Sequence, residues 1–287
     1  MSNSTLIQLT KFATKSLYYE VALSPKPGLV DRFDNGAHKD MDFFMFIDSI
    51  ESLAPHFYEY ARLGFTHNDD LASLFSKLRE EGIKAEHDML EATYQVNTHK
   101  GANFSFAVLL GATGLYLQNH SLPFSFQDTT NILSLVAQMT HHLVEQDFSH
   151  ITEKNKLSHG EKLYIKAGTL GVRGEATQGY PALSSLLLPF FRKRAEQEST
   201  EMLLLRGLIL LISQIEDSNL LHRGGANGWQ QVKQRGVGIH QNKLNELEFK
   251  QNLTTFNQEL IEKNLSPGGA ADLLSLGIYF SFLEKLI

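Results

Sequence analysis

The chain has 287 residues, no cysteine and a formal net charge of −6. Its length allows a sizeable core, and the absence of cysteine excludes disulfide bonds and thiolate chemistry and is compatible with a reducing compartment. The acidic balance argues against a nucleic-acid partner, which would need clustered basic residues. Because the sequence shows neither a signal-peptide pattern nor an apolar run of membrane-spanning length, we expect a cytoplasmic protein without a membrane partner.

Apolar residues recur at helical spacing through the first part of the chain. Pro55 is expected to kink or restart the second helix, and Gly82 to separate the third from the fourth. The fifth segment is apolar on almost all sides, which predicts a helix in the middle of a bundle. The predicted helices cover residues 5–22, 41–63, a third that begins after a cap at Asn68 or Asp69, a fourth that ends near Val96, and 102–118.

The second part of the chain continues this pattern, and no segment shows convincing alternation of period two. The gaps between helices are short except where unusual polar motifs occur. The fold class is therefore predicted to be all-α, a single compact multi-helix bundle over residues 1–287 with an active site built from interhelical loops. The remaining predicted helices cover residues 128–145, 159–167, 181–195, 200–215, 226–235, 242–263 and 269–285.

The loop over residues 24–42 fits no amphipathic template. Two prolines restrict its backbone and two glycines permit tight turns, so its polar side chains are expected to lie on a stiff loop. Its carboxylates are hard oxygen ligands of the kind that Mg²⁺ prefers, and its cations suit phosphate oxygens. A solvated connector with mutually neutralising charges is an equally good interpretation of this segment alone. The charged residues are Asp31, Asp34, Asp40 and Asp42, with Lys26, Arg32 and Lys39.

Four further polar motifs lie at helix boundaries, over residues 97–101, 168–179, 216–225 and 266–272. The first leads into the apolar helix, where Lys100 and the first amides can form an anion cradle. Each of the other motifs alone is as well explained by ordinary helix caps. Their joint composition is more informative, because cations, acids and histidine recur beside glycine or proline. The sequence contains no P-loop, dinucleotide-binding, zinc-hydrolase or serine-hydrolase motif.

Together these motifs resemble the triphosphoribosyl-dephospho-coenzyme A synthase family, whose members make the prosthetic-group precursor for acyl carrier proteins of citrate lyase and malonate decarboxylase. The resemblance covers nearly the whole chain. Departures at Asn103, Ser218 and Tyr180 remove no charged group. The resemblance rests on residues 26–32, 36–43, 97–102, 173–175, 217–225 and 265–272.

The resemblance implies that ATP reacts with 3′-dephospho-CoA. The ribose 2′-hydroxyl of 3′-dephospho-CoA would attack C1′ of ATP and expel adenine, while the triphosphate stays intact. By analogy with other glycosyl transfers, we infer an oxocarbenium-like transition state flanked by a carboxylate and an acid. The product would pass to a carrier-protein transferase, and a homodimer is compatible with the sequence.

Roles for single residues follow as a hypothesis. The cations Lys26, Arg32, Lys100, Arg173 and Arg223 are assigned to substrate phosphates, together with the backbone at Gly268 and Gly269. Mg²⁺ is assigned to Asp31, Asp40 and Asp42, with Glu86 in reserve. Glu175 is the first candidate for the base that takes the 2′-hydroxyl proton and Asp217 the second, while His99 or His38 would protonate or hydrogen-bond the departing adenine.

Two other functional classes remain open from the sequence. One is a metal-dependent phosphohydrolase or glycohydrolase acting on nucleotides, since helical proteins with scattered aspartates and histidines also serve that chemistry. The other is a non-catalytic protein that binds coenzyme A or an acyl carrier protein. The reaction products discriminate among the three, because only the synthase releases adenine and forms a heavier coenzyme adduct.

Overall fold

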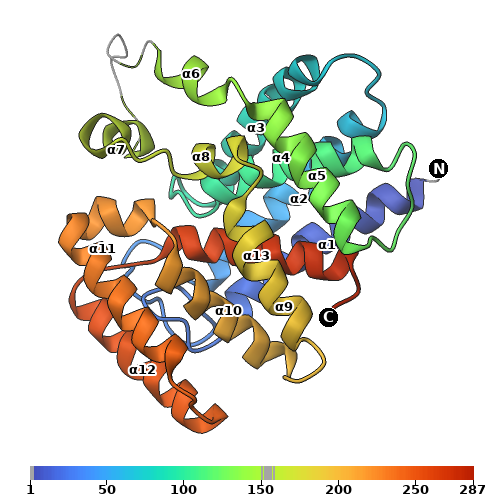
Figure 1. Ribbon diagram of the computed structural model, residues 1–287. Coiled ribbons are helices and arrows are strands. Elements are labelled where there is room, and N and C mark those ends of the chain that lie inside the picture. The colour runs from blue at the N-terminus through green and yellow to red at the C-terminus, as the bar shows by residue number, and fades with distance from the viewer. Residues whose placement is uncertain (1–2, 150, 152–156, 158) are drawn as a thin grey trace.

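The computed structural model describes residues 3–149, 151, 157 and 159–287. These residues form helices and loops without a strand, which confirms the predicted all-α class (Figure 1). None of the described helices is long and apolar enough to cross a membrane. In chain order the helices are α1 (Asn3–Ala22), α2 (Phe43–Phe65), α3 (Leu71–Ala92), α4 (Lys100–Tyr116), α5 (Phe126–Thr140), α6 (Leu143–Phe148), α7 (His159–Ala167), α8 (Val172–Thr177), the π-helix η2 (Ala182–Leu187), α9 (Leu188–Arg194), α10 (Thr200–Gln214), α11 (Ser218–Gln241), α12 (Glu246–Glu262) and α13 (Gly268–Leu283).

Two helices, α4 and α13, form the centre of the structure because apolar residues surround them on nearly all sides. Helix α4 packs against α2, α3, α5 and α13, while α13 also packs against α1 and α10 (Figure 1). The backbones of α2 and α4 approach so closely that a methyl group on Gly64 would overlap the carbonyl oxygen of Gly111. Glycine at this crossing therefore sets the distance between the two helices.

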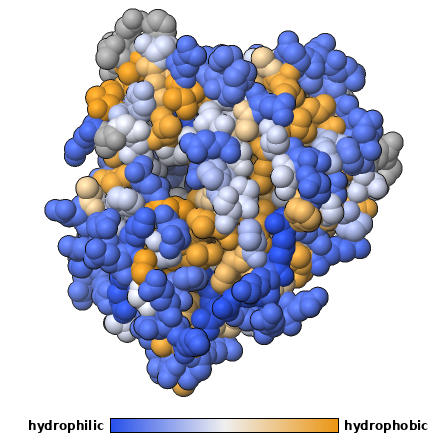
Figure 2. Space-filling view, viewed as in Figure 1, coloured by the Kyte–Doolittle hydropathy of each residue, from blue (hydrophilic) through white to orange (hydrophobic). Residues whose placement is uncertain are grey.

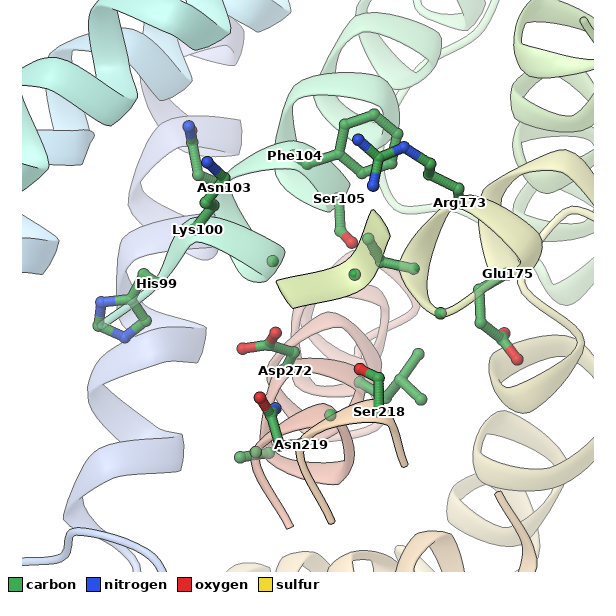
Figure 3. Close-up of a pocket in the computed structure, with 18 of the residues that line it drawn as sticks. His99, Lys100, Asn103, Phe104, Ser105, Arg173, Glu175, Ser218, Asn219 and Asp272 are labelled. Atoms are coloured by element: carbon green, nitrogen blue, oxygen red, sulfur yellow. The ribbon is translucent and has the colours of Figure 1, made fainter. Parts of the chain in front are cut away.

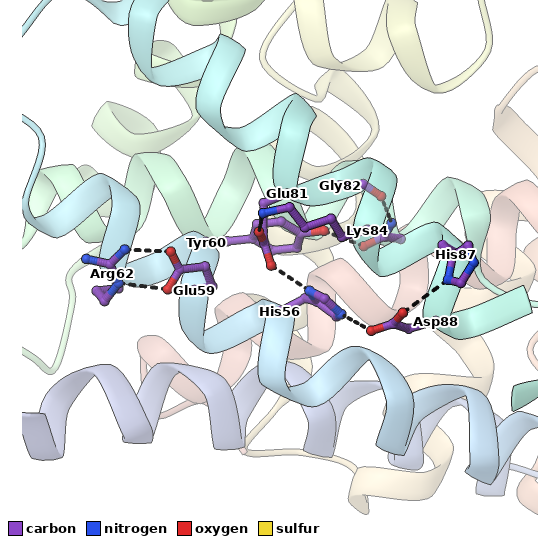
Figure 4. A network of polar contacts seen from close by, with 10 residues as sticks. His56, Glu59, Tyr60, Arg62, Glu81, Gly82, Lys84, His87 and Asp88 are labelled. Atoms are coloured by element: carbon purple, nitrogen blue, oxygen red, sulfur yellow. Dashed lines mark hydrogen bonds and ion pairs between the residues drawn. The ribbon is translucent and has the colours of Figure 1, made fainter. Parts of the chain in front are cut away.

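A polar network fastens α2 to α3 and α4 (Figure 4). The Nδ1 atom of His56 lies 2.6 Å from Oε1 of Glu81, and its Nε2 lies 3.0 Å from Oδ2 of Asp88. One turn later, the Tyr60 hydroxyl donates to Oδ1 of Asn103 at 2.8 Å, and Nδ2 of Asn103 donates to the carbonyl of Gly82 at 3.2 Å. The departure from the family pattern at Asn103 is thus matched by buried hydrogen-bond partners.

Two expectations for the first part of the chain are wrong, the helix break at Gly82 and the helix cap at Asn68 or Asp69. Helix α3 runs without interruption through Gly82 to Ala92, because packing on α2 and α4 outweighs the cost of about 1 kcal/mol for a helical glycine. Its cap is Asp70, whose carboxylate accepts from the amide of Ser73. Helix α2 continues through Pro55 as one helix, so Pro55 does not restart it.

The second part of the chain differs from the expected boundaries in three places. The segment expected over 128–145 divides into α5 and α6, and the one expected over 226–235 is part of the longer α11. The latter contains a break at Gly225, whose φ of 62° is favourable for glycine only. The short helix α8 was not predicted, because six residues that include a glycine give no periodic signal.

Candidate active site

A cavity of about 1360 Å³ opens between the helix ends. All five polar segments found in the sequence contribute to its wall: 24–42, 97–101, 168–179, 216–225 and 266–272. Figure 2 shows a hollow on this face, between the part that carries α7 and α8 and the part that carries α11 (Figures 1 and 2). Segments far apart in the sequence therefore meet around one space, which is large even for a drug-sized ligand site.

His99 lies on the wall of this space and is buried. The Thr98 hydroxyl donates to Oγ of Ser49 at 2.7 Å, and that Oγ lies 2.7 Å from Nδ1 of His99. Nδ1 of His99 and the Ser49 hydroxyl thus share one hydrogen bond, of which either group can be the donor. The Nε2 atom is buried without a partner among the described residues. Burial and then the charge of Lys26 lower the pKa of His99 to about 3, so the ring is neutral.

His38 is also neutral. A guanidinium N–H of Arg223 faces its Nδ1 at 3.1 Å, and Nε2 lies 2.9 Å from the Ser266 hydroxyl. Arginine can only donate, so Nδ1 accepts and Nε2 carries the hydrogen. Burial and the adjacent Arg223 lower the pKa of His38 to about 4. Arg223 itself is anchored by donation to the carbonyl of Ala37 at 2.8 Å.

The predicted phosphate ligand Lys26 is almost fully buried on the cavity wall. Its ammonium lies 2.5 Å from Oε1 of Glu20, a residue of α1 that sequence reasoning did not select. Burial raises the pKa of Glu20, and the attraction of Lys26 opposes that rise. The signal for this pair was a glutamate on the apolar face of the first helix, between Leu17 and Val21.

Two more predicted phosphate ligands lie on the wall with carboxylate partners. Nε of Arg173 donates to Oδ2 of Asp147 at 2.6 Å, and Arg79 donates to Oδ1 of the same carboxylate at 2.8 Å. Burial raises the pKa of Asp147, but the two arginine hydrogen bonds outweigh it and hold that pKa below its usual range. Lys100 is paired with Glu86. Arg79 and Asp147 line the cavity too and were missed, since their helices carried no unusual motif.

Carboxylates on two sides of the cavity are the candidates for proton transfer (Figure 3). Glu175, on α8, accepts one hydrogen bond through Oε2, from the amide of Ala182 at 3.2 Å. Burial raises the pKa of Glu175. Asp272, on α13, has its pKa raised well above the ordinary value by burial and then by the charges of Glu20 and Asp217. Neither carboxylate is paired with a described cation.

Asp217, the second candidate for the base, is not on the cavity wall. Its Oδ1 accepts from the amides of Asn219 and Leu220 at the start of α11, and its Oδ2 accepts from the amide of Ala270 at 3.0 Å. Burial raises the pKa of Asp217 to about 6 against these hydrogen bonds. The carboxylate therefore fastens the start of α11 to the start of α13.

Gly268 and Gly269 line the cavity at the start of α13. A methyl group on Gly268 would lie 2.6 Å from Nδ2 of Asn219, and one on Gly269 would lie 3.0 Å from Oδ2 of Asp217. The two glycines thus allow the starts of α11 and α13 to meet.

The structure does not bring the predicted magnesium ligands together on the cavity wall. Asp31 accepts backbone hydrogen bonds from Lys26 and Phe33, and Asp42 caps α2. Asp40 is exposed, as is Arg32, which stacks on Phe33 outside the cavity. In the part of the chain that the structure describes, the one group close enough to share an ion is exposed on α3: His87, Asp88 and Glu91. The three aspartates therefore do not fit a preassembled magnesium site.

Comparisons with known proteins agree with one another. The model of the family described as ATP:dephospho-CoA triphosphoribosyl transferase matches residues 7–287. A protein of Streptococcus mutans serotype c, named as a probable 2-(5″-triphosphoribosyl)-3′-dephosphocoenzyme-A synthase, is 49% identical over 290 residues, 98% of each chain. Proteins with the same name from Streptococcus equi subsp. equi and Streptococcus pyogenes serotype M5 are each 47% identical, over 99% and 100% of both chains. No solved structure matches.

Proposed function

Because the chain belongs to the ATP:dephospho-CoA triphosphoribosyl transferase family, we propose that its cavity is the place where ATP and 3′-dephospho-CoA react. The enzyme is a pentosyltransferase that moves the 5-triphosphoribosyl group of ATP to the ribose 2′-hydroxyl of 3′-dephospho-CoA and releases adenine. The observation that carries this location is the meeting of five separate polar segments around one space of about 1360 Å³. A space of that size can admit two nucleotides together.

The cations of the wall are suited to hold phosphates without activating them. Lys100, Arg173 and Arg223 face the cavity from α4, α8 and α11, and Arg79 adds a fourth charge. Each of Lys100, Arg173 and Arg79 is paired with a carboxylate of the protein. Phosphate oxygens bind arginine in the same forked geometry as carboxylates, so a triphosphate can replace these partners. The reaction then takes place at the ribose, away from the cations that bind the triphosphate.

Glu175 is the group that we assign to the 2′-hydroxyl proton of 3′-dephospho-CoA. It faces the cavity, has one oxygen free of described partners and prefers the protonated state more than an exposed glutamate does. A base with a raised pKa accepts a proton more readily near neutral pH. Its role is thus to take the proton as the bond from O2′ to C1′ forms.

We propose that Mg²⁺ enters bound to the triphosphate of ATP. An ion carried by the substrate would neutralise phosphate charge there, and it needs no preassembled site of the kind that Asp31, Asp40 and Asp42 fail to form. We also infer that residues 1–287 act as one domain, that the product goes to a carrier-protein transferase, and that the reaction is cytoplasmic because phosphorylated substrates do not cross membranes unaided.

Mass spectrometry of the protein with ATP, Mg²⁺ and 3′-dephospho-CoA tests this function. We expect equal amounts of free adenine and of a coenzyme adduct that carries the intact triphosphoribosyl group. Release of phosphate or of free ribose triphosphate would instead identify a hydrolase. Binding of both substrates without any release of adenine would identify a non-catalytic protein.

A further inference from the structure

Asp272 occupies a position on the cavity wall that no role above uses. It lies in the first turns of α13, and its Oδ2 sits against Cα of Gly101, where a side chain would overlap it. Glycine at position 101 therefore leaves room for the carboxylate at the start of α4. Figure 3 shows Asp272 between His99 on one side and Ser218 on the other, facing the open space.

No cation among the described residues is paired with Asp272. Burial raises its pKa most, and Glu20 on α1 and Asp217 before α11 raise it further. Lys26 from the loop is already bound to Glu20. The remaining neighbours, His99 at the start of α4 and Tyr180 before η2, are neutral. Such surroundings favour the protonated form of the Asp272 carboxyl group over the ionised form.

The departing adenine needs a proton donor, because expulsion of a purine anion is unfavourable. The two cavity histidines were the first candidates, but both are neutral. A neutral imidazole can donate a hydrogen bond yet gives up its last proton only with great difficulty. His99 and His38 can therefore orient a base or a phosphate, while the transferable proton must come from another group.

We propose that Asp272 is the general acid that protonates the departing adenine. The bond from C1′ to N9 breaks and its electron pair goes to the purine, which takes the carboxyl proton of Asp272. The bond from O2′ of 3′-dephospho-CoA to C1′ forms, and the hydroxyl proton goes to Glu175. Neutral adenine leaves, and exchange with solvent returns the proton to Asp272 and removes that on Glu175. This inference rests on the proposed function.

The placement of the two carboxylates supports the assignment of Asp272 as the acid and Glu175 as the base. Asp272 comes from α13 and Glu175 from α8, on different sides of the group of residues in Figure 3. Glycosyl transfer commonly uses two carboxyl groups flanking the anomeric carbon, one protonated and one ionised. Glu175 accepts a backbone hydrogen bond, which favours its ionised form, whereas Asp272 has no such donor.

The test compares Asp272→Asn on two substrates, ATP and ATP methylated at N7 of adenine. Methylation gives the base a positive charge, so 7-methyladenine leaves as a neutral molecule without receiving a proton. With ATP, we expect the variant to lose about 10²- to 10⁴-fold in the rate of adduct formation. With the methylated substrate, the loss should largely disappear. Glu175→Gln is the matched control, because it should be slow on both substrates.

Equal losses of Asp272→Asn on both substrates, or undiminished activity on ATP, would overturn the assignment. If the variant does not fold, the wild-type enzyme supplies the test. Its rate with ATP should fall at high pH as the acid ionises, and this fall should be absent with the methylated substrate. Absence of any adduct from the wild-type enzyme and ATP would contradict the proposed function instead, independently of Asp272.

Discussion

The side chains at the cavity fall into two groups, those that we propose contact the substrates and those that hold the loops in place. Glu175 has one carboxylate oxygen without a described partner, whereas the carboxylates of Asp31 and Asp217 accept from backbone amides. These two groups should respond differently to substitution. Loss of a reacting group changes turnover, while loss of a backbone acceptor changes the free energy of unfolding.

Glu175→Gln should lower turnover by about 10²- to 10⁴-fold, the usual contribution of a positioned base. The substitution keeps the size of the side chain and its ability to accept from Ala182. ATP affinity should therefore change little. Adenine release measures turnover, and titration calorimetry with ATP measures binding; near-normal turnover would remove Glu175 from the mechanism.

Asp31→Asn should destabilise the fold by about 1–3 kcal/mol, because an amide nitrogen cannot accept from the backbone of Lys26. Asp40→Asn is the control, since Asp40 is exposed and should change stability by less than about 0.5 kcal/mol. Denaturant unfolding measures both. A changed magnesium dependence of Asp31→Asn with unchanged stability would restore Asp31 as a metal ligand.

Burial of His99 makes the free energy of unfolding depend on pH and determines the sign of that dependence. Its folded pKa of about 3 lies below the ordinary value of 6.5, so its contribution to stability is complete above pH 6.5 and is lost as pH falls toward 3. Between pH 7.5 and pH 5, His99→Asn should gain about 2 kcal/mol relative to the wild type. Unfolding curves of both proteins at the two pH values measure this; parallel pH profiles would contradict it.

At the level of helices, close packing around α4 determines where the cavity wall lies. Gly64→Ala should cost about 1–3 kcal/mol or more, because its methyl group would overlap the carbonyl oxygen of Gly111. Gly238→Ala on the exposed face of α11 has open space around it and should be neutral or stabilising by up to about 1 kcal/mol. Thermal unfolding compares the two, and equal effects would show that the α2–α4 contact can relax.

Helices with a strong periodic signal were predictable from the sequence. The apolar segments that became α4 and α13 were located to within about two residues, the usual uncertainty of a boundary. Two local signals misled, because Gly82 and Pro55 lie inside helices that tertiary contacts hold together. Helix α8, which carries both Arg173 and Glu175, was read as a glycine-rich loop. Its residues were still chosen, since the motif did not depend on the helix.

Across the protein as a whole, the sequence identified the segments of the site but not all of its members. Motif reading found His99, Lys100 and Arg173, which stand beside unusual residues. Glu20, Arg79 and Asp147 lie on ordinary helical faces, and only the folded arrangement turns them toward the cavity. Asp31 and Asp42 show the opposite case, because a carboxylate that caps a backbone has the same sequence signature as one that binds a metal.

The shared carboxylate of Asp147 has a consequence for the protein before any substrate arrives. Arg79 and Arg173 both donate hydrogen bonds to this one carboxylate, and Glu86 forms an ion pair with Lys100. These carboxylates reduce the mutual repulsion among the cations, so the cavity wall needs no anion from solution to keep its arrangement. A nucleotide that binds to these cations therefore does not need to order the cavity wall. Its phosphates replace carboxylates that are already bound there.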